Sequence, residues 1–334
     1  MVALKNIVHL SILIFLSGCG SSDKKDALGQ IESIDSGLSG IIDDNAKIEI
    51  VAKGFDWCEG PLWLEESKTL IFSDVPNNII HSWSAETGLK EYLTPSGYTG
   101  SGSRVGEKGS NGLTLSRDNK LLICQHGDRR VVAMDASLFD PHPNYVTLAD
   151  NFGSKKFNSP NDLAVRSNGD VYFTDPPFGL PGMNSDSTKE IPFNGVYRIS
   201  NGKVSLLIDT LTYPNGIAFL PNGNTFIVAN SDADKPFWYA FDIDDQDSIV
   251  NPRIFYDATK EFKEEGGGPD GLKVDGKGNV FATGPGGIWI FNSDGKVLGK
   301  IKLKGGVSNC ALTEDEKTLF VTNGNKIIRV KLRD

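Results

Sequence analysis

The sequence contains little of what most metal and redox sites are built from, with 4 Cys, 4 His and 3 Met in 334 residues. It contains no C-x-x-C and no H-E-x-x-H, which excludes a zinc ribbon, a thioredoxin-like redox motif and a zincin metalloprotease. It also lacks G-x-S-x-G, the nucleophile turn of serine esterases. Lys and Arg are scattered in a chain of net charge −9 and form no basic run, so we expect no nucleic-acid partner.

Long apolar runs are also missing, apart from one short segment near the start of the chain. Residues 7–16 are apolar, Lys5 precedes them, and the segment is too short to span a bilayer as a stable helix. It ends in Leu-Ser-Gly-Cys19, which resembles a bacterial lipobox. This resemblance implies a lipoprotein signal peptide over residues 1–18 and a lipid group on Cys19. An ordinary secretory signal with a chance Cys is the alternative.

The segment after Cys19 is polar and rich in Ser, Asp, Gly and Lys. Residues 19–45 are therefore predicted to form a flexible tether. The protein is expected to be exported and held at the bacterial cell envelope by its lipid anchor alone. The remaining cysteines are odd in number and widely spaced, which favours buried free thiols at Cys58, Cys124 and Cys310 and leaves a disulfide between Cys58 and Cys310 open.

Six segments of the chain share one pattern: a short motif opens an apolar strand, a turn follows, and a second β-rich strand comes next. The motifs begin 39 to 55 residues apart, at Glu59, Asn111, Asn161, Asn215, Asp270 and Asn309. This spacing predicts an all-β fold, a six-bladed β-propeller over residues 46–334. No segment has a sustained helical apolar pattern, which excludes a Rossmann or α/β-hydrolase domain. Few residues follow Arg329, so Lys47–Val51 is predicted to close the last blade from the N-terminal side.

The first residues of the six motifs all carry oxygen in their side chains. Inner strands of a propeller run in the same direction, so these residues are expected to converge at one mouth of the central channel. A ring of carboxylate and carboxamide oxygens predicts a site for a hard divalent cation. The alternative is a set of ordinary turns, because Asn111, Asn215 and Asp270 are each followed by Gly. Recurrence at one phase of the repeat favours the cation site.

Four of these motifs resemble those of a known family. Glu59-Gly-Pro, Pro-Asn161-Asp, Pro-Asn215-Gly and Pro-Asp270-Gly are similar to signature positions of the regucalcin/gluconolactonase family of six-bladed propeller hydrolases. The resemblance implies a divalent cation bound by Glu59, Asn161, Asn215 and Asp270. Ca²⁺ is the expected ion, with Mg²⁺, Mn²⁺ and Zn²⁺ as alternatives. It also implies that Asp270 is the catalytic acid/base and that Asn161 contacts substrate.

Other residues place the chain within that family. Asn111 and His126 resemble the bacterial gluconolactonase branch, and we expect Asn111 to bind substrate. Ser159 stands where the animal proteins carry an Arg that contacts the sugar acid, so substrate contacts are expected to differ. His126 follows a second strand and is expected at the same mouth, where a neutral imidazole relays protons near pH 7. A hydrogen bond to a neighbouring loop is its alternative role. The long segments 95–110 and 176–194 are candidates for the wall of the pocket.

The expected function is a metal-dependent hydrolase that opens a sugar lactone. The cation would polarise the lactone carbonyl, and Asp270 or His126 would deprotonate the attacking water. One alternative is hydrolysis of a phosphotriester or aryl ester on the same cation. Another is a non-catalytic propeller, plugged by calcium, that binds a glycan or a protein.

Overall fold

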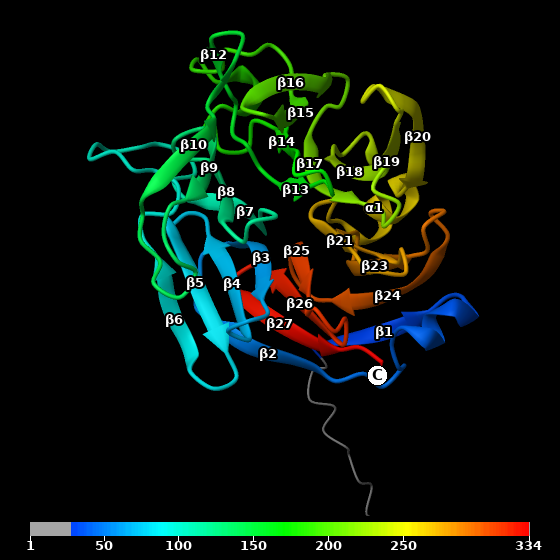
Figure 1. Ribbon diagram of the computed structural model, residues 1–334. Coiled ribbons are helices and arrows are strands. Elements are labelled where there is room, and N and C mark those ends of the chain that lie inside the picture. The colour runs from blue at the N-terminus through cyan, green and yellow to red at the C-terminus, as the bar shows by residue number, and fades with distance from the viewer. Residues whose placement is uncertain (1–27, 334) are drawn as a thin grey trace, which may run out of the picture.

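The computed structural model describes residues 28–333, and nearly all of its regular structure is β-strand (Figure 1). Its six antiparallel sheets are arranged around an axis as the blades of a propeller, which confirms the predicted fold class. The first three blades are β3 (Cys58–Leu64), β4 (Thr69–Asp74), β5 (Ile79–Ser84) and β6 (Gly88–Leu93); β7 (Ser110–Leu115), β8 (Leu121–Gln125), β9 (Arg130–Met134) and β10 (Tyr145–Ala149); and β13 (Leu163–Val165), β14 (Val171–Asp175), β15 (Gly195–Ser200) and β16 (Lys203–Ile208).

The other three blades follow in chain order and draw on both ends of the described chain. They are β17 (Pro214–Phe219), β18 (Thr225–Ser231), β19 (Pro236–Ile243) and β20 (Ile249–Asp257); β21 (Leu272–Val274), β22 (Val280–Gly284), β23 (Gly287–Phe291), β24 (Val297–Leu303) and β1 (Gly29–Ser33); and β25 (Val307–Leu312), β26 (Thr318–Asn323), β27 (Lys326–Lys331) and β2 (Ile48–Lys53). Outside the blades lie β11 (Asn151–Phe152), β12 (Lys155–Lys156), the helix α1 (Thr259–Glu265) and the 3-10 turns η1 (Ser36–Gly40) and η2 (Met183–Ser185).

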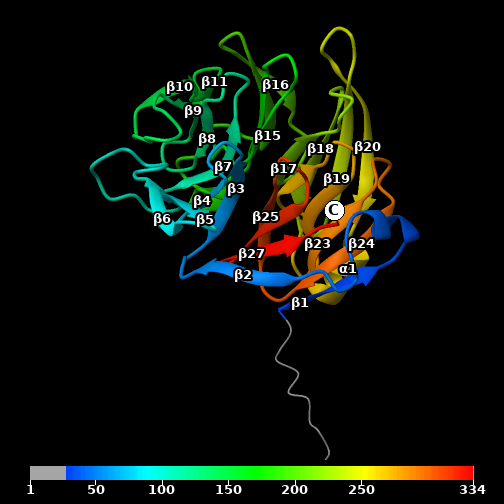
Figure 2. The same cartoon turned by 60° about the horizontal axis from the view of Figure 1, so that its bottom comes forward.

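In each blade the first strand lies nearest the axis and the later strands lie farther out (Figures 1 and 2). The inner strands β3, β7, β13, β17, β21 and β25 contact one another in sequence, and β25 contacts β3 again, so the ring is continuous. All six begin at the same end of the molecule. The circular arrangement of the six sheets therefore places the first residue of every repeat around one channel mouth.

The hydrophobic core is divided into six clusters, one between each pair of neighbouring blades. Each sheet is thus covered on both faces, which explains why its middle strands are apolar along their length rather than alternating. In β8 and β22 every residue is buried. The same packing buries Cys58, Cys124 and Cys310, and all three are free thiols in the described chain.

The ring is closed by the predicted N-terminal strand. β2 pairs antiparallel with β27, with Ile48 opposite Val330 and Ile50 opposite Ile328. Glu49 bonds to Arg329 across the same pair of strands. This pairing removes the free edge that blade six would otherwise expose.

The predicted flexible tether over 19–45 is wrong for the part that the structure describes. Residues 29–33 form β1, a fifth strand on the outer edge of blade five, where Gly29 pairs with Leu303 and Ser33 with Gly299. Leu38 in η1 and Ile42 just after it have side chains that are buried between blades five and six. The polar composition gave no sign of these two apolar side chains, whose burial fixes residues 29–42 on the propeller.

Residues 1–27 and 334 are outside the described part of the chain. The signal peptide over 1–18, lipidated Cys19 and the first part of the tether therefore remain predictions. Within residues 28–333, no helix is long and apolar enough to cross a bilayer.

Candidate metal and active site at the channel mouth

The structure places the six repeat residues at the start of the six inner strands or just before them. Five of them are buried, and Asp270 is partly exposed. Their backbones are joined across the blades, since Gly112 N–H donates to Asn161 O at 2.7 Å and Gly271 N–H donates to Ser308 O at 2.7 Å. Gly60 has a positive φ of 48° and lies so close to Asn111 O that a side chain would clash there. The turn glycine is thus needed for close approach between blades one and two.

A set of buried hydroxyls fixes this ring: Ser73 and Thr174 lie on the second strands β4 and β14, and Ser308 lies on the inner strand β25. Ser73 Oγ donates to Asn111 O at 2.9 Å, and Thr174 Oγ1 donates to Asn215 O at 2.7 Å. Ser308 Oγ donates to Cys58 O at 2.6 Å and so joins blade six to blade one. Sequence reasoning missed these residues, although Ser73 and Thr174 occupy the same position near the end of their strands.

Two of the predicted ligands are acids whose charges oppose each other. Burial, together with the charges of Asp162 and Glu107, raises the pKa of Glu59 to about 8. Burial and the charges of Glu59 and Asp162 also hold the pKa of Asp270 well above its usual range. Like charges gathered in a buried site disfavour ionisation until a cation enters. The electrostatics of the mouth therefore suit a cation.

Asp162 is a third acid at this mouth, and the sequence analysis did not single it out. It lies beside Asn161 and is buried; its Oδ1 accepts Leu163 N–H at 2.9 Å. Its other oxygen, Oδ2, is buried without a hydrogen-bond partner in the described chain. The signal in the sequence was the Asp of Pro-Asn-Asp, because the other five repeats carry Gly or Cys directly after the repeat residue.

The carboxamides complete the set of oxygen donors. Asn215 Nδ2 donates to Ser231 Oγ at 3.0 Å, and the Asn215 side chain also bonds to Asp270. Asn111 Oδ1 is buried with no partner among the described residues. Asn309 differs, because its Oδ1 accepts from Cys310 N–H and from Lys273 Nζ.

These donors fit a hard cation, which takes carboxylate and carboxamide oxygens together. Within residues 28–333, no three His, Cys, Asp or Glu side chains form a cluster that could hold a metal ion. The predicted set differs from such a cluster because half of it is neutral amide: Glu59 and Asp270 supply charge, and Asn161 and Asn215 supply carbonyl oxygens.

His126 lies beside this ring and is paired with an acid that the sequence analysis missed. Its Nδ1 lies 2.5 Å from Glu107 Oε2, and its ring is fully buried. Glu107 belongs to the long segment 95–110, which the sequence marked only as a candidate wall. The hydrogen bond to a neighbouring loop, which was the alternative role for His126, is thus present. It leaves Nε2 without a partner in the described chain.

Ser159 has a structural task. Its Oγ donates to Pro176 O at 2.5 Å and accepts from Gly179 N–H at 2.9 Å. Ser159 N–H and Asn158 N–H both donate to Asp175, each at 2.8 Å. These bonds hold the chain leading to Asn161 against the segment 176–194.

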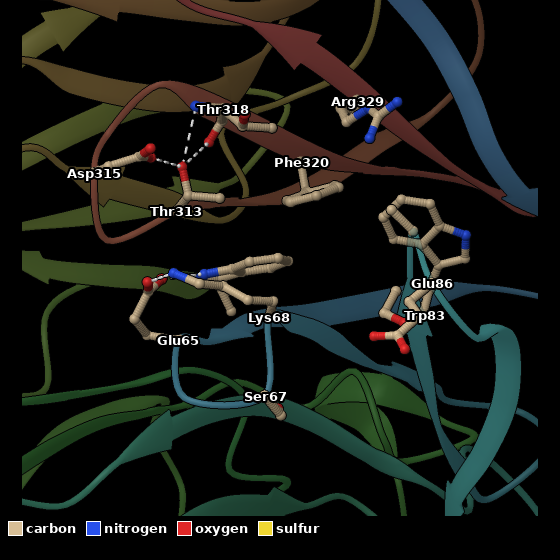
Figure 3. Close-up of a pocket in the computed structure, with 13 residues that line it drawn as sticks. Glu65, Ser67, Lys68, Trp83, Glu86, Thr313, Asp315, Thr318, Phe320 and Arg329 are labelled. Carbon is tan, nitrogen blue, oxygen red and sulfur yellow. Dashed lines mark hydrogen bonds and ion pairs between the residues drawn. The ribbon is translucent and has the colours of Figure 1, made fainter.

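One open pocket, of about 400 Å³, lies at the other end of the propeller, between blades one and six (Figure 3). It is lined by turn residues such as Glu65 and Thr313 and contains none of the six repeat residues. Its aromatic surfaces are partly covered, since Trp63 stacks on Phe320 and Arg329 lies 5.5 Å from the Trp83 ring. The predicted site is therefore distinct from this pocket.

Comparison with known proteins decides the family. Residues 57–325 match the family described as "SMP-30/Gluconolactonase/LRE-like region", which covers all six inner strands. This chain belongs to that family. The resemblance read from the four sequence motifs is thereby confirmed.

Relatives within the SMP-30/gluconolactonase family cover most of the chain. A gluconolactonase of Zymomonas mobilis is 35% identical over 313 residues, which cover 92% of this chain and 87% of that protein. The structure of a gluconolactonase from Xanthomonas campestris is 28% identical with a TM-score of 0.79, over 91% of this chain and 95% of that one. A calcium-binding regucalcin of Agrobacterium tumefaciens shares the fold, at 18% identity and a TM-score of 0.66 over 86% and 96% of the two chains.

Proposed function

We propose that this protein hydrolyses a sugar lactone at the mouth described above. The observation that carries the proposal is the convergence of Glu59, Asp270 and the carboxamides at one buried, acidic mouth. Membership of the family supports it, as do the relatives named gluconolactonase in two bacteria and pentonolactonase in Haloferax volcanii, the last 24% identical over 72% of each chain. The substrate class is thus an aldonolactone.

Glu59, Asn161, Asn215 and Asp270 are the residues that would hold the cation, with Ca²⁺ the expected ion. When bound, such an ion acts as a Lewis acid on a carbonyl oxygen. The protein's own contribution is to gather these oxygens before the ion arrives. The hydrogen bonds from Ser73 and Thr174 to the backbone carbonyls of Asn111 and Asn215 hold the ring together against the repulsion between its acidic side chains.

Two groups at the mouth are candidates to take the proton from the attacking water, Asp270 and His126. Asp270 is one of the acidic ligands, and its hydrogen bond from Asn215 fixes the carboxylate. His126 Nε2 is buried and has no hydrogen-bond partner among the described residues. A general base of either kind contributes about 10²–10⁴-fold to turnover.

The test is hydrolysis of a panel of aldonolactones after EDTA treatment, with Ca²⁺, Mg²⁺, Mn²⁺ or Zn²⁺ then added back. Activity is expected to disappear with EDTA and to return with one of these ions. Asp270→Asn keeps a ligating oxygen and removes basicity, so as the base it should lose about 10²–10⁴-fold in turnover without rescue by excess cation. Full activity of the metal-free protein, or no lactone hydrolysis with any ion, rules the proposed function out.

A further inference from the structure

The contact between Glu107 and His126 has the geometry of an orienting pair. His126 Nδ1 faces Glu107 Oε2 at 2.5 Å, and the imidazole is fully buried. A carboxylate only accepts hydrogen bonds, so Nδ1 is the nitrogen that carries the hydrogen. The neutral ring then has its lone pair on Nε2, and that atom has no partner in the described chain. The arrangement leaves one nitrogen held and the other free to act.

The backbone around the pair is also fixed. Arg104 Nη2 donates to His126 O at 3.1 Å, and Arg104 Nε donates to Glu107 O at 3.2 Å. His126 N–H donates to Gly109 O at 3.1 Å. Gly179 packs against the imidazole so closely that an added Cβ would lie about 3 Å from its Cγ. Three segments distant in sequence thus hold the pair in one orientation.

The pair lies at the channel mouth. Gln125, the residue before His126, pairs with Ser110 in the inner ladder, and Ser110 precedes Asn111. The carboxylate of Glu107 is also one of the smaller causes, after burial and Asp162, that raise the pKa of Glu59. Both observations place His126 at the end of the propeller where the cation ligands gather.

We propose that Glu107 is a positioning residue that makes His126 Nε2 the proton acceptor of the lactonase reaction. The inference rests on the proposed function and leaves Asp270 as a ligand. Water oxygen bonds to the lactone carbonyl carbon as its O–H proton passes to Nε2. The ring C–O bond then breaks, the released alkoxide oxygen takes that proton from Nε2, and the product is the open hydroxy acid. The carboxylate of Glu107 stabilises the imidazolium formed between these steps.

The first experiment compares steady-state kinetics of Glu107→Gln, His126→Ala and the double variant with the wild type. His126→Ala is expected to lower kcat by about 10²–10⁴-fold. Glu107→Gln, which keeps the shape of the side chain, is expected to lower kcat by about 10–100-fold. KM and bound cation, measured by elemental analysis, should not change. Because Glu107 acts through His126, the double variant should be no slower than His126→Ala alone.

Val146→Ala is the control, since Val146 lies on β10, in the same blade as the strand that leads to His126 but outside the segment 95–110, and is 49% exposed. It should keep wild-type kcat. A Glu107→Gln protein with wild-type kcat, or losses that multiply in the double variant, would overturn the proposal. A fall in cation content together with kcat would also overturn it, because Glu107 would then act on the metal site instead.

A second readout does not depend on lactone hydrolysis. A buried Nδ1–H held by a carboxylate should give a proton NMR signal far downfield of the amides, present in the wild type and lost in both Glu107→Ala and His126→Ala. Absence of this signal from the wild type overturns the proposal. If the signal is present and the wild type hydrolyses no lactone with any cation, the proposed function fails while the orienting pair stands.

Discussion

At the scale of single residues, the site is defined by acids whose burial works against their charge. Glu59 and Asp270 would be neutral over part of the pH range without a counter-ion, since burial and neighbouring carboxylates raise the pKa of both. A single negative charge at this mouth therefore has opposite effects on the cation-bound and the cation-free protein. It strengthens cation binding, and it destabilises the cation-free fold.

Glu59→Gln separates these two effects. The variant should bind Ca²⁺ more weakly by roughly tenfold or more, because ligand charge sets the affinity of such sites. Its cation-free form should be at least as resistant to urea as the cation-free wild type, since one buried charge is gone. Asn161→Ala, which removes a neutral ligand, should weaken binding less. Calorimetry of Ca²⁺ binding checks both variants, and an unchanged Glu59→Gln affinity would exclude Glu59 as a ligand.

Asp175 makes stability depend on pH. Burial raises its pKa to about 7, although Asn158 and Ser159 N–H groups bond to the carboxylate. Between about pH 4 and 7 the folded protein then keeps a proton that the unfolded chain has lost. Protonation favours the folded state here, so this contribution to stability falls as pH rises through that range and stays constant above it.

Asp175→Asn removes the titrating group at similar size. The free energy of unfolding of the wild type minus that of the variant should fall by about 1 kcal/mol per pH unit between pH 4 and 7. Urea denaturation at half-unit steps of pH measures the difference. A difference that is independent of pH would show that Asp175 ionises normally in the folded protein.

At the scale of elements, residues 29–42 show how two buried apolar side chains, Leu38 and Ile42, can fix a largely polar segment on the propeller. β1 adds a fifth strand to blade five, and η1 brings Leu38 into the core, where it is 1% exposed. Asp35 accepts Gly37 N–H at 2.9 Å and begins the turn. The segment is therefore part of the folded domain, and its removal should cost stability.

Leu38→Ala tests this role. It should lower the free energy of unfolding by about 2–5 kcal/mol, the cost of leaving a cavity in a packed core. Ile34→Ala in the same segment is the matched control, because Ile34 is 51% exposed and should change stability little. Thermal and urea unfolding measure both. Equal stability of the two variants would mean that the segment detaches without loss.

The predictions from the sequence agree best with the structure for residues that recur at the same position of each repeat. The oxygen-bearing first residues recur at one phase, so Glu59 and Asp270 could be singled out without coordinates. Glu107 could not, because it stands in an irregular segment with no counterpart in other blades, and its contact with His126 depends on how that segment folds back. Asp162 lay inside a motif that the sequence analysis quoted, and only its unpartnered oxygen shows its place in the site.

At the scale of the whole molecule, the described chain begins on the side of the channel mouth. Gly29 pairs with Leu303, at the end of blade five where β21 starts. We propose that Cys19 is lipidated, as the lipobox-like sequence suggests. The ten residues from Gly20 to Gly29 could then span at most roughly 35 Å. The mouth would be held within that reach of the membrane surface.

Cys19→Ala checks the anchor. The wild type should be in the membrane fraction and should incorporate radiolabelled palmitate, and the variant should be released or left unprocessed. Fractionation and gel mobility distinguish these outcomes. A variant that is processed normally and still fractionates with membranes would disprove the lipid anchor.

The sequence by itself determined the number of blades, the closing strand and the kind of atom at each first position. These follow from local patterns, because strand length, turn residues and residue type are set within a few neighbouring positions. The tertiary structure alone decided which acids face one another, which nitrogen of His126 is held, and that β1 joins blade five. Each of these depends on segments far apart in the chain meeting in space, and no local pattern records which partner a buried side chain will find.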